Sequence, residues 1–194
     1  MGTKIREGQL QSRTPIVLIH DAAIDEFIST MLLTVMPGVD LLGIIIVNAD
    51  CLAVPAMEAA SKLQQFLGRA DIPIALSRAR GWNAFPWPYR GDCVAFADIP
   101  SLQPFTAKAV TPPRDGELLL ETLLAKAIKE NNPLTLLMTG PMTPLTKDKS
   151  RSVVKSGFYH RASISRLLFI PRCPVDILPY KGARCVGDAL IGVC

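Results

Sequence analysis

The sequence has no apolar run long enough to cross a membrane. Its longest strongly apolar run, at residues 41–47, has seven residues, whereas a transmembrane helix needs roughly 20. The first residues, MGTKIREGQLQSR, also have no apolar core of the kind found in secretory signals. We therefore expect a soluble, cytoplasmic protein that has no membrane partner.

Cysteine and histidine are too few and too scattered to indicate a zinc site. The five cysteines are an odd number and none stands in a CxxC spacing, so reduced thiols are expected rather than a disulfide framework. The two histidines are His20 and His160. His20 ends a predicted buried strand, where a packed, neutral imidazole is expected, and no role is assigned to His160.

The charge is unevenly distributed along the chain, although the formal net charge is only +4. Residues 1–146 carry 12 basic and 14 acidic side chains, whereas residues 147–194 carry 9 basic and 3 acidic ones. The basic segment has no aromatic platform and no recognised nucleic-acid motif, so nucleic acid is not an expected partner. We predict an arm at residues 1–14, an α/β domain at 15–146 and an atypical basic tail at 147–194.

Short apolar runs alternate with amphipathic segments through most of the chain. Strands are predicted at residues 16–20, 41–47, 72–76 and 134–138, with a further candidate at 166–170. Helices are predicted at residues 25–35, 54–67 and 116–130, the last with Asp115 as its N-cap. The apolar residues of the first helix, expected to face the sheet, are Phe27, Ile28, Met31, Leu32 and Val35. The alternation predicts an α/β fold of three layers with a mostly parallel, Rossmann-like sheet.

No strand or helix periodicity is visible between residues 77 and 114. A loop of this length inside a domain is usually functional or flexible. Trp82, Trp87 and Tyr89 crowd its first part, where they would either stack on a planar ligand or cover the edge of the core.

Polar side chains follow three of the predicted strands at the points where the strands end. Parallel strands bind ligands at their carboxyl ends, so these side chains are expected at one edge of the sheet. They are Asp21, Asp25, Glu26, Asn48, Asp50 and Thr139.

Three of these carboxylates fall within the single segment HDAAIDE. Carboxylates so close together repel one another, and calcium, which prefers several oxygen ligands, would neutralise them. Alternatively, Asp25 and Glu26 complement the positive end of the following helix dipole without any metal. The other polar residues at the strand ends favour a metal site.

Three segments, in order, resemble the inosine–uridine-preferring nucleoside hydrolase family. PIVLIHDAAIDEFISTMLL resembles the family signature, an apolar strand followed by D-x-D-P-G-x-D-D and a helix. VDLLGIIIVNADC resembles the strand L-G-I-T-T-V-A-G-N, and LLMTGPMTPL resembles the strand that ends in T-G-P-L-T-N. The match extends from about Pro15 to Leu145.

The resemblance implies a role for each matched residue in a calcium-dependent ribose site. Asp21 and Glu26 would bind calcium through their carboxylates, and Thr139 would bind it through its carbonyl oxygen. Asp25 and Asp50 would hydrogen-bond the ribose hydroxyls, with Asn48 as a further substrate-binding residue. The implied reaction is hydrolysis of the N-glycosidic bond of a ribonucleoside, in nucleoside salvage, with Asp21 taking the proton of the attacking water.

The sequence departs from the family pattern at several places. Ile19 stands for the first aspartate of the signature, Glu26 for the fourth, and Ala22 and Ala23 for Pro-Gly. The family's domain is longer, and its later half supplies another metal aspartate and, in many members, a histidine for the leaving base. Since neither can be placed in residues 147–194, the fold is expected to be incomplete at its carboxyl end, as in a truncated member with impaired activity.

Other functions remain as alternatives at this point. A non-catalytic nucleoside- or ribose-binding module would keep the same half of the site. A dinucleotide-binding domain is disfavoured because no G-x-G-x-x-G follows the first strand. An aspartyl phosphatase of the haloacid-dehalogenase type is disfavoured because Ala23 stands where a second aspartate is required. The sequence leaves the oligomeric state open, including a homo-oligomer.

Overall fold

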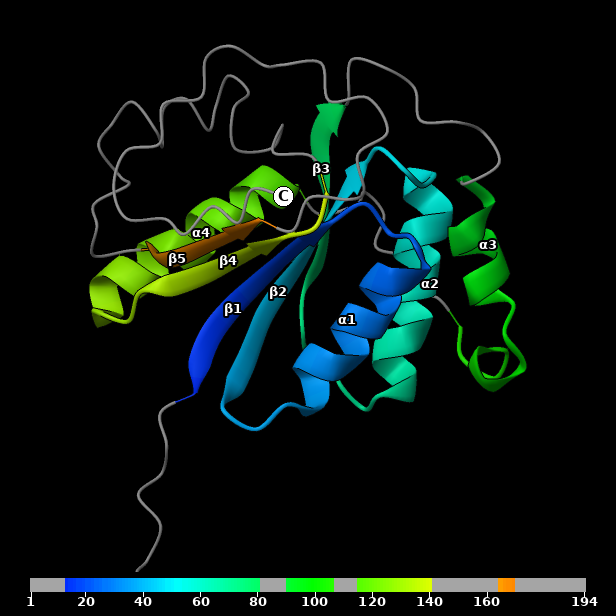
Figure 1. Cartoon of the computed structure of the whole chain (residues 1–194), viewed down its shortest axis with the longest axis horizontal. Coiled ribbons are helices and arrows are strands. Elements are labelled where there is room, and N and C mark those ends of the chain that lie inside the picture. Colours follow the sequence, from blue (N-terminus) through cyan, green and yellow to red (C-terminus); the bar gives the residue numbers. More distant parts are fainter. Residues whose placement is uncertain (1–12, 81–89, 107–114, 141–163, 170–194) are drawn as a thin grey trace, which may run out of the picture.

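A five-stranded parallel sheet organises the described part of the chain (Figure 1). The structure is a computed structural model that describes residues 13–80, 90–106, 115–140 and 164–169. The strands are β1 (Thr14–His20), β2 (Val39–Asn48), β3 (Ile74–Arg80), β4 (Leu134–Met138) and β5 (Ile164–Phe169). Their order across the sheet is β3-β2-β1-β4-β5, and every neighbouring pair is parallel. The predicted fold class is confirmed.

Helices cover both faces of the sheet and complete the three layers (Figure 1). One face carries α1 (Ile24–Val35), α2 (Ala53–Phe66), the short α3 (Asp92–Ala97) and the 3₁₀ turn η2 (Pro100–Leu102). The other face carries α4 (Gly116–Glu130). None of the helices in the described ranges is long and apolar enough to cross a membrane.

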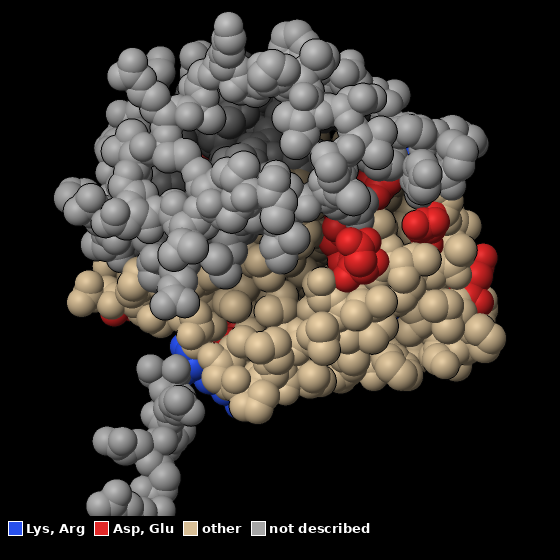
Figure 2. Space-filling model, viewed as in Figure 1, with Lys and Arg blue, Asp and Glu red and all other residues tan. Residues whose placement is uncertain are grey.

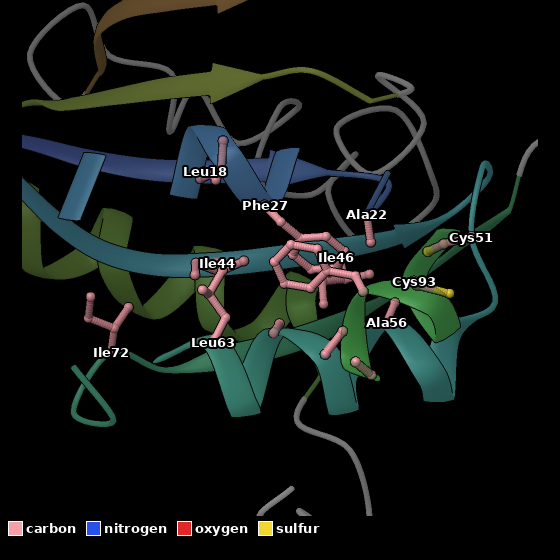
Figure 3. Close-up of a cluster of buried hydrophobic side chains, with 14 of the residues drawn as sticks. Leu18, Ala22, Phe27, Ile44, Ile46, Cys51, Ala56, Leu63, Ile72 and Cys93 are labelled. Atoms are coloured by element: carbon pink, nitrogen blue, oxygen red, sulfur yellow. The ribbon is translucent and has the colours of Figure 1, made fainter. Parts of the chain in front are cut away.

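The central strand β1 contributes to both cores because successive side chains of a strand point to opposite faces. Ile16 and Leu18 belong to the core under α1 and α2, which Figure 3 shows in close-up. Val17 and Ile19 belong to the core under α4. This is why the run from Pro15 to His20 is continuously buried and reads as uniformly apolar rather than alternating.

Most of the predicted elements are present, with shifts at their ends. The helix at 116–130 and the strand at 134–138 match α4 and β4 at both ends, and the candidate at 166–170 is β5. The sequence did not predict α3, which interrupts the expected loop at 77–114. Trp82, Trp87, Tyr89 and His160 lie outside the described residues, as does the predicted boundary after residue 146.

The buried face of α1 differs from the predicted one. Phe27 is fully buried, but Ile28, Leu32 and Val35 are 49%, 54% and 68% exposed. The predicted face is therefore wrong for these three positions. Polar residues take the inner positions instead, because the helix also buries Glu26 and Thr30.

The start of α4 is fixed against the end of β3. Asp115 caps the helix, since its carboxylate accepts from the backbone N–H groups of Glu117 and Leu118 at 3.1 and 3.2 Å, as predicted. The Glu117 carboxylate accepts from Ser77 Oγ at 2.6 Å. Gly116 lies directly against the sheet, where a Cβ would come within 2.8 Å of Ile45 Cγ2 and 2.9 Å of the Ser77 backbone nitrogen.

We expect Gly116→Ala to destabilise the fold by about 1–3 kcal/mol, because the added methyl group overpacks a backbone contact that cannot move aside. Gly91→Ala is the matched control: a Cβ there meets nothing within 4 Å, and its φ of −79° suits alanine. Urea unfolding would measure both free energies. Equal stability of the two variants would contradict the close packing of α4.

Candidate functional site

The carboxyl ends of the strands bring polar residues to one edge of the sheet. Asp21 follows β1, Asp50 lies two residues beyond β2, and Thr139 follows β4. Since β1 pairs in parallel with both β2 and β4, these strand ends are neighbours. Figure 2 shows acidic side chains gathered on the side toward which the strands run. The sequence-based expectation that Asp21 and Thr139 share one edge is thereby met.

Asp21 lies in close contact with the turn that follows β4. The Thr139 backbone N–H donates to the Ile19 carbonyl at 3.0 Å, which continues the pairing of the two strands beyond their ends. A Cβ on Gly140 would lie 3.1 Å from the Asp21 nitrogen and 3.3 Å from the Asp21 Cβ. Only glycine permits this approach without displacing Asp21.

The turn between β1 and α1 adopts an unusual backbone. Ala22 has a φ of +64°, a left-handed conformation that side chains other than glycine rarely adopt. Its N–H donates to His20 Nδ1 at 3.0 Å. Because Nδ1 accepts, the buried imidazole is neutral with its proton on Nε2, in agreement with the expected packed histidine.

Glu26 has a structural role in the same turn. Its Oε2 accepts from the Ala23 backbone N–H at 2.8 Å, at the N-cap of α1. Ala23 has no polar side chain to complete a capping box, so the carboxylate of Glu26 supplies the side-chain contact at this helix start. One oxygen of Glu26 thus lies at the positive end of the α1 dipole, in line with the alternative in which Asp25 and Glu26 complement that dipole, and its other oxygen, Oε1, is also buried.

Burial separates the candidate residues into two groups. Asp21, Glu26 and Asp50 are at most 4% exposed. Asp25 is exposed on the first turn of α1, and Asn48 is half-buried at the end of β2. Burying ionised carboxylates is costly unless partners compensate their charges, so these three are the residues of this edge whose charges most need compensation.

The candidate ligands are oxygen donors of the type that a hard cation prefers, but the described residues contain only a few of them. Asp21, Glu26 and the strand-end oxygens of Thr139 are hard oxygen donors, which calcium prefers. Thr139 Oγ1 is buried and has no hydrogen-bond partner within the part of the chain that the structure describes. No group of three or more His, Cys, Asp or Glu side chains in these residues is arranged to hold a metal ion.

A pair of thiols beside this edge was not predicted from the sequence. Cys51 directly follows Asp50, and it is buried in the same hydrophobic core as Cys93 of α3, whose thiol raises the pKa of Cys51. The two cysteines are 42 positions apart in the chain, and α3 was not predicted. No spacing motif could have revealed them, because only the packing of α3 brings them together.

The fold and the polar strand ends define an α/β domain with a ligand site at the carboxyl edge of a parallel sheet. No protein-family model matches the chain, and no curated protein matches it in sequence. Solved structures do match. An inosine–uridine-preferring nucleoside hydrolase from Bacillus anthracis is 28% identical with a TM-score of 0.65, over 80% of this chain and 50% of that one.

Two further nucleoside hydrolases share the fold at lower identity. An inosine–guanosine nucleoside hydrolase is 20% identical with a TM-score of 0.58, over 75% of this chain and 43% of its own. A purine-preferring ribonucleoside hydrolase from Gardnerella vaginalis is 17% identical with a TM-score of 0.58, over 81% and 48%. The chain is a divergent, nucleoside-hydrolase-like domain, and it spans about half the length of these relatives.

We expect Ala22→Pro to destabilise the fold by at least about 3 kcal/mol, although the nucleoside hydrolase signature has proline there. Proline cannot adopt a φ of +64°. It also has no N–H, so the hydrogen bond from residue 22 to His20 Nδ1 would be lost. Ala22→Gly should change the stability by less than about 1 kcal/mol, because relief of the backbone offsets the loss of a buried methyl group. Thermal unfolding of both variants is the measurement. A stable Ala22→Pro protein would mean that this turn has a different backbone.

Proposed function

We propose that this chain is a nucleoside hydrolase-type enzyme that cleaves the N-glycosidic bond of ribonucleosides, with Asp21 as the central residue. The observation that carries this proposal is the placement of Asp21, buried at the end of β1 and packed against the turn of Thr139 and Gly140. The similarity to structures of nucleoside hydrolases supports the same reaction class.

The metal that the resemblance implies is calcium. Asp21 and Glu26 would hold it through carboxylate oxygens, and Thr139 through its carbonyl. When bound, calcium would orient the ribose diol and lower the pKa of a coordinated water. The hard-oxygen character of these donors supports a cation at this edge, as does the buried hydroxyl of Thr139, which has no hydrogen-bond partner among the described residues.

The remaining roles fall to residues around Asp21. Its carboxylate would accept the proton of the water that attacks C1′ of the ribose. Asp25, Asn48 and Asp50 would hydrogen-bond the sugar hydroxyls, with Asp25 the most exposed of the three. As the glycosidic bond breaks, the ribosyl group gains positive charge, which the buried carboxylates would stabilise electrostatically.

The departing base also needs a proton, and the described residues offer no evident donor for it. His20 is the one histidine within those residues, and it is fully buried inside the turn, with Nδ1 already accepting a hydrogen bond. We infer that cleavage of ordinary nucleosides by this chain is slow. The physiological setting that we propose is nucleoside salvage in the cytoplasm.

Calcium should raise the melting temperature of the chain, because a ligand that binds only the folded state stabilises it by mass action. At a calcium concentration ten times its Kd, the rise should be about 3–6 °C. Asp21→Asn should abolish most of it. Differential scanning fluorimetry with and without calcium measures the shift.

Asp40→Asn is the matched control for Asp21→Asn. Asp40 is also an aspartate at the end of a strand. It is the second residue of β2, so it lies at the amino end of the strand, on the opposite edge of the sheet. This variant should keep the calcium response of the unmutated protein. A melting temperature that does not depend on calcium in the unmutated protein would remove the metal from the proposal.

The chain should hydrolyse p-nitrophenyl riboside much faster than inosine or uridine. The nitrophenolate leaves without a proton, whereas a base that lacks its general acid loses roughly 10²–10⁴-fold in rate. Asp21→Ala should remove the activity on the riboside, because the attacking water then has no base. Release of nitrophenolate and of free base would be followed by absorbance.

Two outcomes would change the assignment. Rapid cleavage of inosine by the unmutated chain would mean that residues outside the described ranges supply the proton. Binding of ribose or nucleoside without hydrolysis of any of the three substrates would favour a non-catalytic binding module.

A further inference from the structure

Two cysteines from distant parts of the chain meet at the edge of the sheet where the candidate site lies. Cys51 follows Asp50 in the connection from β2 to α2, and Cys93 lies in the first turn of α3. Both are free thiols and both are buried. Figure 3 shows their side chains next to each other, and each thiol shifts the pKa of the other.

Contacts that do not involve the thiols hold α3 in this position. The ring of Phe96 stacks on that of Phe27 in α1, with centroids 4.2 Å apart and planes 16° from parallel. Lys62 Nζ of α2 donates to the Ala97 carbonyl at 3.2 Å. Cys93 is thus presented to Cys51 by packing against two other helices, and its Sγ lies 3.9 Å from the carbonyl oxygen of Leu52.

We propose that Cys51 and Cys93 form a redox-active dithiol that closes reversibly into a disulfide. Closure requires the two neighbouring sulfurs to come together to the S–S bond length of about 2.05 Å. The disulfide would join α3 covalently to the residue that follows Asp50. It would therefore restrain the loop at the end of β2 that carries this carboxylate.

The two sulfurs have different roles in the reaction. The neighbouring Cys51 thiol, together with backbone groups of Leu52 and of the first turn of α3, lowers the pKa of the Cys93 thiol and makes it the better nucleophile. The oxidant is a low-molecular-weight disulfide of the glutathione type. The Cys93 thiolate attacks one of its sulfurs and releases the first thiolate, leaving a mixed disulfide on Cys93.

Cys51 completes the exchange. It loses its proton, attacks the sulfur of Cys93 and releases the second small thiolate. One small disulfide is reduced to two thiols, and two protein thiols are oxidised to one disulfide, so that atoms and electrons balance. Because both thiols are buried, the exchange requires local opening of α3, a helix of only six residues.

The test treats the native, full-length chain with glutathione disulfide and then blocks all remaining thiols by alkylation. Peptide mapping by mass spectrometry should identify a Cys51–Cys93 cross-linked peptide that lacks two hydrogen atoms and disappears after reduction. The oxidised protein should melt about 5–10 °C higher than the reduced protein, since a cross-link restricts the unfolded chain. Replacing Cys173, Cys185 and Cys194 together by serine should leave the cross-link intact.

Single substitutions separate the two roles. Cys51→Ser should trap the mixed disulfide of Cys93 with glutathione, and Cys93→Ser should leave Cys51 largely unmodified. The proposal fails if both cysteines of the native, unmutated chain stay reduced, or if each takes up glutathione without forming the cross-link. None of these measurements uses calcium or hydrolysis, so their outcome is independent of the proposed function.

Discussion

The structure depends above all on the parallel pairing of β1 with β4. This pairing extends past the ends of both strands, where the Thr139 N–H donates to the Ile19 carbonyl, and it brings Gly140 against the backbone of Asp21. A Cβ on residue 140 would force the two segments to shift by a few tenths of an ångström. The position of Asp21 is therefore set by backbone contacts rather than by its own side chain, and a rigid sheet positions a charged group more firmly than a loop does.

The turn after β1 carries the energetic cost of this arrangement. Ala22 is held in a left-handed conformation, and Glu26 is buried completely to cap α1. Both features are unfavourable in isolation, and the surrounding hydrogen bonds to His20 and Ala23 sustain them. Because α1 turns Glu26 and Thr30 inward, it leaves Ile28 and Leu32 toward its exposed side. The helix therefore buries less apolar surface than its sequence allows, and it places polar side chains next to the strand ends instead.

The sequence allowed the sheet to be predicted because its strands are buried on both faces and read as continuous apolar runs, as at β1 and β2. The strand ends, and with them the shared edge of Asp21 and Thr139, followed from the alternation of strands and helices. The inner face of α1 could not be predicted from hydrophobicity, since the helix buries Glu26 and Thr30 and leaves Ile28, Leu32 and Val35 exposed. Neither could α3, whose six residues are too few for a period to be visible.

The same short helix connects the apolar core to the polar edge. Through Phe96 it stacks on Phe27, which follows Glu26 in α1 and contacts His20 edge-on, with ring centroids 6.2 Å apart. Through Cys93 it contacts Cys51, the residue after Asp50. A movement of α3 would therefore reach the ends of both β1 and β2, since this helix contacts Phe27, next to Glu26, and Cys51, next to Asp50. Packing in the core and geometry at the polar edge are consequently not independent in this fold. A substitution at Phe96 removes only apolar contacts, but it acts on the helix that also carries Cys93 beside Cys51.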